Sequence, residues 1–209
     1  MIIRSAALLG SAPDLASCPQ SDLPEFAFIG RSNVGKSTLV NMLTRREGLA
    51  KVSGTPGKTQ LINFFIVNES WTLVDLPGYG YARTGRKERV DFSSLVSDYL
   101  QKRPNLRVTF VLVDSRLTPQ EIDLDFVRWM AERGLPFSLI FTKTDKLSRA
   151  AAQANIDAFL LRFQEISADA PRVLASSSKL GHGRAEILEL IASTLAQSAG
   201  DREAVKTIA

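Results

Sequence analysis

The segment GRSNVGKS, Gly30 to Ser37, carries residues that could bind phosphate, and it matches the pattern of a phosphate-binding loop. Gly30 and Gly35 allow tight turns, so that several backbone N–H groups can converge on phosphate oxygens. Lys36 would supply a cation for the β- and γ-phosphates, and Ser37 a hydroxyl for Mg²⁺. The segment therefore predicts a nucleoside triphosphate site, and a coincidental surface turn is the alternative.

A second segment, TKTD from Thr142 to Asp145, has the chemistry to select a base. Asp145 can accept two hydrogen bonds from guanine, at N1–H and the exocyclic amine, whereas adenine offers no matching pair of donors. The methylene stem of Lys143 can lie along the base. Residues 175–178, ASSS, follow another predicted strand and could bring backbone N–H groups to the guanine carbonyl. Each tetrapeptide alone would be an ordinary loop, so the prediction of guanine depends on their combination with the phosphate loop.

The segment VDLPGYGYA places Asp75 at the end of an apolar run, before a turn. An acid there can hold a Mg²⁺-bound water, and the Gly78 N–H can sense the γ-phosphate. The glycine-rich, basic stretch 45–60 is expected to form a second nucleotide-responsive loop. It offers two threonines for the magnesium shell, Thr55 and Thr59, and we favour Thr59 because PGKTQ stands directly before a predicted strand.

Strand patterns alternate with helical patterns along the chain, which predicts an α/β fold with a mainly parallel sheet covered on both faces. Two of the strands, separated by Asn68, Glu69 and Ser70, are expected to form an antiparallel hairpin. The predicted strands are residues 26–30, 61–67, 71–75, 108–114, 136–141 and 172–176, and the predicted helices are 37–44, 89–100, 119–134, 148–166 and 183–198.

Composition excludes several classes of protein. The chain has 209 residues, of which 44% are hydrophobic and 23% charged, as in an ordinary globular domain. No apolar run is long enough to span a bilayer. The single cysteine, Cys18, cannot form an internal disulfide and suits a reducing cytoplasm, and Pro13 and Asp14 argue against lipoprotein processing there. The single histidine, His182, excludes a histidine metal cluster and disfavours a Ser-His-Asp hydrolase; we expect it to be an exposed residue at a helix start.

Taken together, GRSNVGKSTLVNML, GTPGKTQLINFF, DLPGYGYA, TKTD and ASSS resemble the EngB family of bacterial GTP-binding proteins, in the Era-like group. The resemblance covers about residues 24 to 197. It implies a three-layer P-loop NTPase fold, like that of small GTPases, with a six-stranded mostly parallel sheet, one antiparallel strand and helices on both faces. It also implies a GTPase domain at 23–198, between an N-terminal extension at 1–22 and a flexible tail at 199–209; both ends are expected to fray.

The same resemblance implies a function: hydrolysis of GTP to GDP and phosphate in assembly of the large ribosomal subunit, with a need for the protein in normal cell division and septation. We expect a cytoplasmic monomer without stable membrane insertion. Mg²⁺ would be held by Ser37 and Thr59. The residues expected to contact GTP or GDP are Gly30, Arg31, Ser32, Asn33, Val34, Gly35, Lys36, Ser37, Gly57, Lys58, Thr59, Gln60, Leu61, Asp75, Leu76, Pro77, Gly78, Thr142, Lys143, Thr144, Asp145, Ala175, Ser176 and Ser177.

Catalysis would depend on Lys36, Thr59, Asp75 and Asn33. Tyr79 stands where Ras-like proteins carry a water-orienting glutamine, so hydrolysis should be slow, and packing is the expected role of this tyrosine. Related GTPases use an asparagine at the position of Asn33 to coordinate K⁺, and we hypothesise the same here; the alternative is that Asn33 only caps the turn.

The positive charge of the chain is uneven and indicates a partner. Residues 45–58 carry four basic residues against one acidic, and residues 83–107 seven against three, while the remainder has a net charge of −3. This placement favours a polyanion such as ribosomal RNA of a large-subunit precursor, over a solvated basic face or an anionic membrane surface. Two other functions remain open, a GTP-dependent scaffold at the division site and a kinase that uses ATP.

Overall fold

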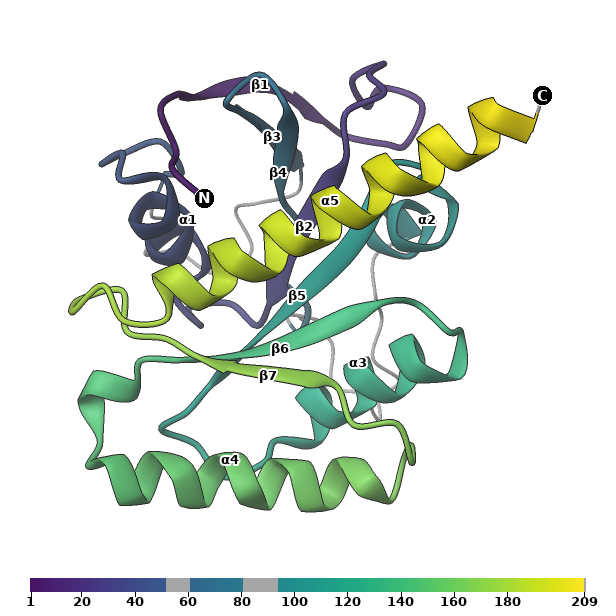
Figure 1. The fold of residues 1–209 in the computed structure, drawn as a ribbon. Helices are drawn as coiled ribbons and strands as arrows, with labels where there is room; N and C mark the ends of the chain where they lie inside the picture. The colour runs from purple at the N-terminus through teal and green to yellow at the C-terminus, as the bar shows by residue number, and fades with distance from the viewer. Residues whose placement is uncertain (52–60, 81–93, 209) are drawn as a thin grey trace.

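The computed structural model describes the backbone of residues 1–51, 61–80 and 94–208, with side chains as far as Gln197, and has one sheet between two layers of helices (Figure 1). The strands are β1 (Ala6–Ala12), β2 (Glu25–Gly30), β3 (Ile62–Val67), β4 (Trp71–Asp75), β5 (Leu106–Asp114), β6 (Phe137–Thr142) and β7 (Arg172–Ala175). The helices are α1 (Lys36–Thr44), α2 (Ser94–Lys102), α3 (Glu121–Glu132), α4 (Arg149–Gln164) and α5 (Arg184–Ile208), with a 3₁₀ turn, η1 (Thr144–Lys146).

The sheet has the order β1-β3-β4-β2-β5-β6-β7. Strands β4, β2, β5, β6 and β7 are parallel, and β3 is antiparallel to both of its neighbours. The six predicted strands and the single antiparallel one are therefore confirmed, as is the β3–β4 hairpin. In its turn, Asn68 and Glu69 have φ angles of 49° and 53°.

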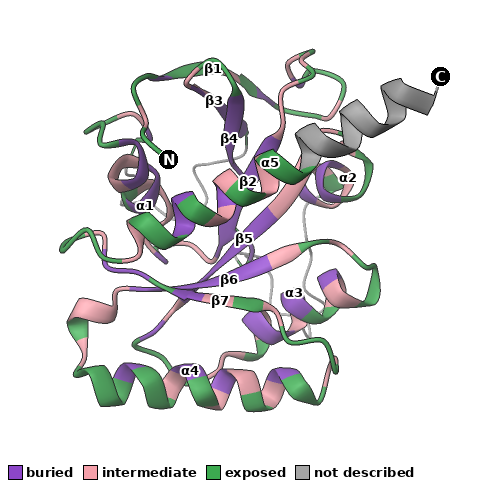
Figure 2. Ribbon diagram, viewed as in Figure 1, coloured by how far each residue is buried: buried purple, intermediate pink, exposed green. Residues whose placement is uncertain are grey.

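Both faces of the central strands are buried, which explains their continuous apolar runs (Figure 2). Successive side chains of a strand point to opposite faces. In β2, Phe26 and Phe28 pack with the core under α1 and α5, whereas Ala27 and Ile29 pack with the core under α2, α3 and α4. These two cores make the three-layer architecture that the sequence predicts.

Strand β1 is the main departure from the predicted fold. Residues 1–22 were expected to fray and six strands were expected, but Ala6–Ala12 forms a seventh strand at the edge of the sheet, antiparallel to β3. The prediction of fraying is therefore wrong for this segment. Its sequence, AALLGSA, gives little signal because alanine and glycine have low strand propensity and Leu8 and Leu9 are both exposed.

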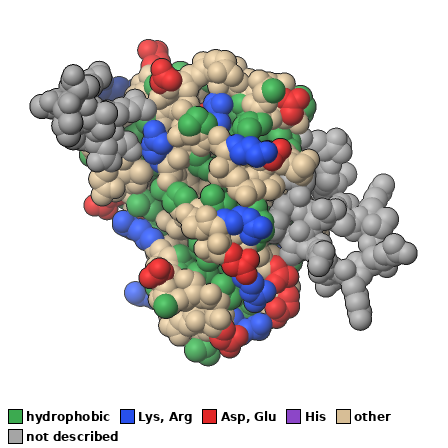
Figure 3. All heavy atoms as spheres, turned by 90° about the vertical axis from the view of Figure 1, so that its right-hand side faces the viewer, with side chains coloured by type: hydrophobic (Ala, Val, Ile, Leu, Met, Phe, Trp, Pro, Cys, Tyr) green, Lys and Arg blue, Asp and Glu red, His purple; other side chains and the backbone are tan. Residues whose placement is uncertain are grey.

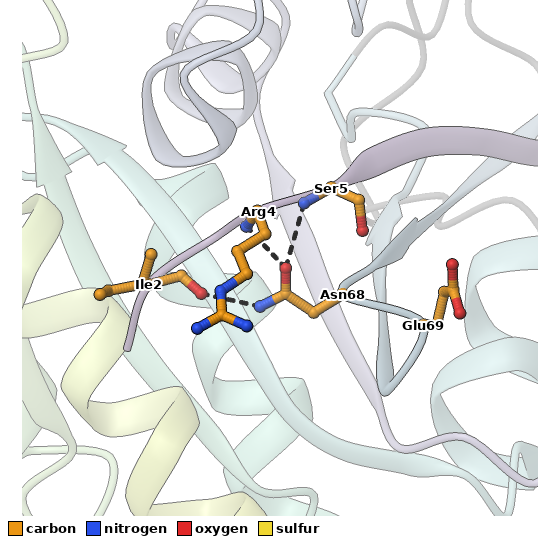
Figure 4. Close-up of a pocket in the computed structure, with 5 residues that line it drawn as sticks. All are labelled: Ile2, Arg4, Ser5, Asn68 and Glu69. Atoms are coloured by element: carbon orange, nitrogen blue, oxygen red, sulfur yellow. Dashed lines mark hydrogen bonds between the residues drawn. The ribbon is translucent and has the colours of Figure 1, made fainter.

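The turn between β3 and β4 holds the start of this edge strand. The Asn68 side chain accepts hydrogen bonds from the backbone N–H groups of Arg4 and Ser5, and donates one to the carbonyl of Ile2 (Figure 4). These residues and Glu69 line a hollow of about 460 Å³. It lies at the amino end of β4, opposite the end that carries Asp75, so it is remote from the predicted phosphate loop.

The last helix also exceeds its prediction. Helix α5 runs to Ile208, whereas the sequence predicted a helix end at Ser198 and a flexible tail. The segment 199–208 contains one glycine but no proline, and its alanine, arginine, glutamate and lysine are good helix formers. Among the residues that the structure describes, no helix combines the length and the apolar composition that a membrane crossing requires.

A buried ionic cluster fixes α2 to the amino end of β2. Arg103 donates to both carboxylate oxygens of Glu25, at 2.6 Å for the shortest contact, and the hydroxyl of Tyr99 donates to the same carboxylate at 2.6 Å. Arg103 also donates to the carbonyl of Pro19 at 2.7 Å. A buried carboxylate needs such partners, so this cluster joins residues before β2, the strand itself and α2.

Candidate nucleotide-binding site

The predicted phosphate loop connects the last residue of β2 with the first turn of α1. Asn33 and Gly35 have φ angles of 65° and 105°, and the Val34 N–H donates to the carbonyl of Arg31 at 3.2 Å, which closes the turn. In the described structure α1 has no side-chain cap and no acidic residue in its first turn. Within the described residues no side chain of its cap or first turn thus offers a negative charge to its N-terminus, which suits a bound phosphate.

Lys36 and Asp75 meet at the centre of the site. The Lys36 ammonium contacts the Oδ1 of Asp75, with side-chain exposures of 11% and 7%. Strands β2 and β4 are parallel neighbours in which Phe28 pairs with Asp75, so this acid ends beside the phosphate loop. Two largely buried charges need each other, and the contact brings together the two residues that the sequence assigned to the phosphates and to magnesium.

The segment after Asp75 lies against the phosphate loop. The Leu76 N–H donates to the carbonyl of Phe28 at 3.0 Å, and Pro77 is buried. A Cβ atom at Gly78 would lie 2.8 Å from the carbonyl oxygen of Gly30, closer than a real Cβ approaches. Only glycine therefore permits this close approach, which places the Gly78 backbone at the loop.

A magnesium ion fits the groups that the structure describes here. Ser37 lies in the first turn of α1, next to Lys36 and its partner Asp75, and hydroxyl and carboxylate oxygens are ligands that Mg²⁺ prefers. Within the described ranges no group of three His, Cys, Asp or Glu side chains is placed to hold a metal. Leu61 is exposed directly before β3. The other predicted site residues of this stretch lie outside the described residues: Thr55, Gly57, Lys58, Thr59 and Gln60.

The predicted guanine-recognition segment follows β6, at the same edge of the sheet as the phosphate loop. Asp145 lies in η1, and its Oδ1 accepts a hydrogen bond of 2.7 Å from the hydroxyl of Ser177. That bond lowers the pKa of Asp145. The carboxylate therefore stays ionised at neutral pH, the state that can accept hydrogen bonds from a base.

The segment ASSS is held beside TKTD by the pairing of β6 with β7, in which Phe141 lies opposite Ala175. Thr144 donates to the carbonyl of Ser176 through both its N–H and its hydroxyl, at 3.2 and 3.1 Å. Ser177 and His182 exchange backbone hydrogen bonds of 3.2 and 3.1 Å. His182 is exposed just before α5, as predicted, but its backbone helps to fix the serine that contacts Asp145.

Lys143 spans the two halves of the site. Its ammonium donates to the carbonyl of Asn33 at 2.6 Å and to Oδ2 of Asp114 at 2.8 Å. Burial would raise the pKa of Asp114, but hydrogen bonds from Arg116 and Lys143 outweigh it and hold the pKa at about 2. Asp114 therefore holds the Lys143 ammonium between the base segment and the phosphate loop.

The role of Asp114 in the site was not predicted from the sequence, although its position at the end of a strand indicated one. This acid ends the strand VTFVLVD just as Asp75 ends WTLVD, and the carboxyl ends of parallel strands share one edge of a sheet. Which cation it would meet could not be read from that pattern.

Tyr79 packs into the protein, as the sequence indicated. It is 4% exposed, and its ring stacks on Phe126 with centroids 4.4 Å apart. Its hydroxyl donates to Oδ1 of Asp123, on α3, at 3.0 Å. The hydroxyl therefore makes a contact within the fold rather than one that would orient water at a phosphate.

A three-layer fold with this loop after β2, an acid at the end of β4 and an aspartate-bearing segment after β6 is that of a P-loop GTPase. A family model described as a 50S ribosome-binding GTPase matches residues 25–143. Two solved structures share the fold. A probable GTP-binding protein engB matches with a TM-score of 0.62 and 25% identity over 83% of this chain and 99% of its own. The translation elongation factor SelB of Methanococcus maripaludis matches with a TM-score of 0.58 and 17% identity over 84% and 34%.

Two relatives that are similar in sequence over most of their length carry the same name. A probable GTP-binding protein EngB of Bacteroides thetaiotaomicron is 51% identical over 191 residues, covering 91% of this chain and 95% of its own. Another, of Christiangramia forsetii, is 46% identical over 191 residues, covering 91% and 96%. The chain belongs to the EngB family of GTP-binding proteins.

Proposed function

We propose that the chain is a GTP-driven switch that acts in assembly of the large ribosomal subunit and is needed for normal cell division and septation. The observation that carries the proposal is that the base segment and the phosphate loop lie together at one site. Lys143 links the two segments, and Lys36 of the loop pairs with Asp75. The description of the matching family, a 50S ribosome-binding GTPase, supports the ribosomal part. We further propose residues 23–198 as the GTPase domain of a cytoplasmic monomer that does not insert into membranes.

In this proposal each named residue has a task when nucleotide binds. Lys36 would leave Asp75 for the β- and γ-phosphates, and the carboxylate of Asp75 would then be available to help hold Mg²⁺ through its water. Ser37 and Thr59 would hold the Mg²⁺, which neutralises charge on the phosphates. Slow intrinsic hydrolysis follows from Tyr79, whose hydroxyl is engaged by Asp123.

Asn33 is proposed to bind K⁺ beside the phosphates. Its side chain is exposed and makes no hydrogen bond to the described residues, so the alternative of a side-chain cap finds no support there, while its carbonyl is held by Lys143. Replacing NaCl by KCl should raise the rate of phosphate release by roughly tenfold or more, since a cation at this point stabilises developing charge.

The Asn33→Ala variant should lose this response while it retains GDP affinity. The assay is run with and without large-subunit particles. An equal rate in both salts under both conditions would end the potassium proposal without touching the rest of the site.

A cluster of arginines supports a polyanionic partner. Arg46 donates to the carbonyl of Arg4 at 3.1 Å, and Arg184 donates to the carbonyls of Met42 and Leu43, next to Arg45 at the end of α1. None of the four arginines pairs with an acid among the described residues. Residues 52–60 of the sequence contain no acid and add Lys58. In contrast, the face drawn in Figure 3 mixes cations with acids, without a broad patch of either.

We expect the double variant Arg45→Glu/Arg46→Glu to bind large ribosomal subunits more weakly in co-sedimentation with a non-hydrolysable GTP analogue. If both side chains contact phosphates, the slope of log affinity against log salt should fall by about 1.5. The matched control is Arg128→Glu/Arg133→Glu, on α3 and directly after it, whose arginines already pair with Asp125 and Glu132.

If the affinity for large ribosomal subunits and its salt dependence were unchanged in Arg45→Glu/Arg46→Glu, these arginines would not belong to the interface. Failure of the wild-type chain to associate with the particles in any nucleotide state would instead overturn the ribosomal role. In that case septal localisation with negligible turnover would favour the scaffold function.

A further inference from the structure

Two side chains from separate segments meet at one buried carboxylate on α3. Asp123, in the first turn of α3, accepts the Tyr79 hydroxyl on Oδ1 at 3.0 Å, and its Oδ2 lies 3.6 Å from the guanidinium of Arg31. Arg31 belongs to the phosphate loop and Tyr79 follows the DLPG segment. Their backbones also form a parallel bridge. Asp123 thus joins both segments to α3.

The carboxylate has little other reason to be buried. Asp123 is 3% exposed, and burial raises its pKa to about 6, although Arg31 and the Tyr79 hydroxyl oppose this rise and the nearby Asp114 adds to it. A carboxyl group used only for packing could be replaced by an apolar side chain at lower cost. Its two partners therefore point to a positional role.

Gly78 lies beside this cluster and against the phosphate loop. Gly78 directly precedes Tyr79, and a Cβ atom on it would lie 2.8 Å from the carbonyl of Gly30 and 3.4 Å from the nitrogen of Ser32. With the Tyr79 ring held between Phe126 and the Asp123 contact, the adjoining Gly78 N–H has little freedom to move away from the loop.

We propose that Asp123 is a positioning residue which, through Tyr79 and Arg31, holds the Gly78 N–H in place for the third phosphate and so raises the affinity for GTP relative to that for GDP. The inference rests on the proposed role of Gly78. A group held in its bound position before the ligand arrives costs less ordering on binding. Because GDP lacks the third phosphate, its affinity does not depend on this contact.

The test is the near-isosteric variant Asp123→Asn, which still accepts from Tyr79 but no longer pairs with Arg31. By calorimetry, its affinity for a non-hydrolysable GTP analogue should fall by roughly tenfold, as for one charge-assisted contact, while GDP affinity stays within about twofold. Asp125→Asn, two residues along α3 and paired with Arg128 at the surface, is the matched control and should change neither affinity. Tyr79→Phe should act in the same direction, and less than additively with Asp123→Asn.

The pH dependence of nucleotide affinity is a second measurement, and a purely structural role of Asp123 would not change it. Protonation of Asp123 removes its charge, so between pH 7.5 and pH 5.5 the affinity for GTP relative to GDP should fall further in the wild-type chain than in Asp123→Asn. The γ-phosphate titrates equally with every variant, so the difference between curves reports Asp123. Urea unfolding of Asp123→Asn at pH 7.5 should show no loss of stability, because the raised pKa means that the ionised form is the less stable one in the fold.

The inference would be overturned if Asp123→Asn lost GTP and GDP affinity equally, or lost neither. It would also be overturned if the affinity ratio of the wild-type chain and that of the variant changed in parallel with pH. If the wild-type chain shows no preference between the two nucleotides at neutral pH, the role of Gly78 fails. If it shows a preference that Asp123→Asn keeps, only the inference about Asp123 fails.

Discussion

We expect the Asp145→Asn variant to bind GTP about a thousandfold more weakly than the wild-type chain, a loss of ~4 kcal/mol. The ionised carboxylate accepts two hydrogen bonds from guanine, and the amide of asparagine offers one acceptor and a donor that faces the donors of the base. Ser177 would still donate to the remaining oxygen, so the loop itself should persist.

The same change should alter base preference, not only weaken binding. Xanthine carries a carbonyl where guanine has its exocyclic amine, so it matches the asparagine amide. Xanthosine triphosphate should therefore bind the variant better than GTP does, measured by competition against a labelled nucleotide. Asp157→Asn, on the exposed surface of α4, is the control. If Asp145→Asn kept its preference for guanine, the base site would be wrong, and ATP competing equally in the wild-type chain would support a kinase instead.

The second large effect is expected for Lys36→Ala. Affinity for both GTP and GDP should fall at least about a hundredfold, because the cation that meets the phosphates is removed. The nucleotide-free chain should also lose stability, by roughly 3 kcal/mol, since the Asp75 carboxylate is left buried without its partner. Nucleotide titration and urea unfolding measure the two effects separately.

A double variant separates these two contributions. Lys36→Ala/Asp75→Asn removes the unpaired charge, so it should recover much of the lost stability but none of the nucleotide affinity. If the double variant recovered nucleotide affinity as well as stability, the assignment of Lys36 to the phosphates would be contradicted. If it recovered neither, the ion pair would not be what stabilises the nucleotide-free chain.

Local sequence alone determined much of this protein. The phosphate loop, its position between a strand and a helix, the β3–β4 hairpin and the six central strands all follow from short segments. Backbone turns and buried strands depend on the residues within a few positions, and glycine, β-branched and aromatic residues report them directly. For the same reason Lys36, Asp75 and Asp145 could be assigned tasks before any contact was known.

Only the tertiary structure decided which distant groups meet. Asp114 ends a strand, and nothing near it in the chain predicts Lys143 as its partner. Asp123 lies in the first turn of a helix, and its neighbours in the chain do not predict Tyr79 and Arg31 as its partners. Strand β1 is stabilised by hydrogen bonds to β3 and to Asn68 rather than by its own composition. Such contacts join residues far apart in the chain, and their energy comes from burial and hydrogen bonding across elements, which local residue preferences do not contain.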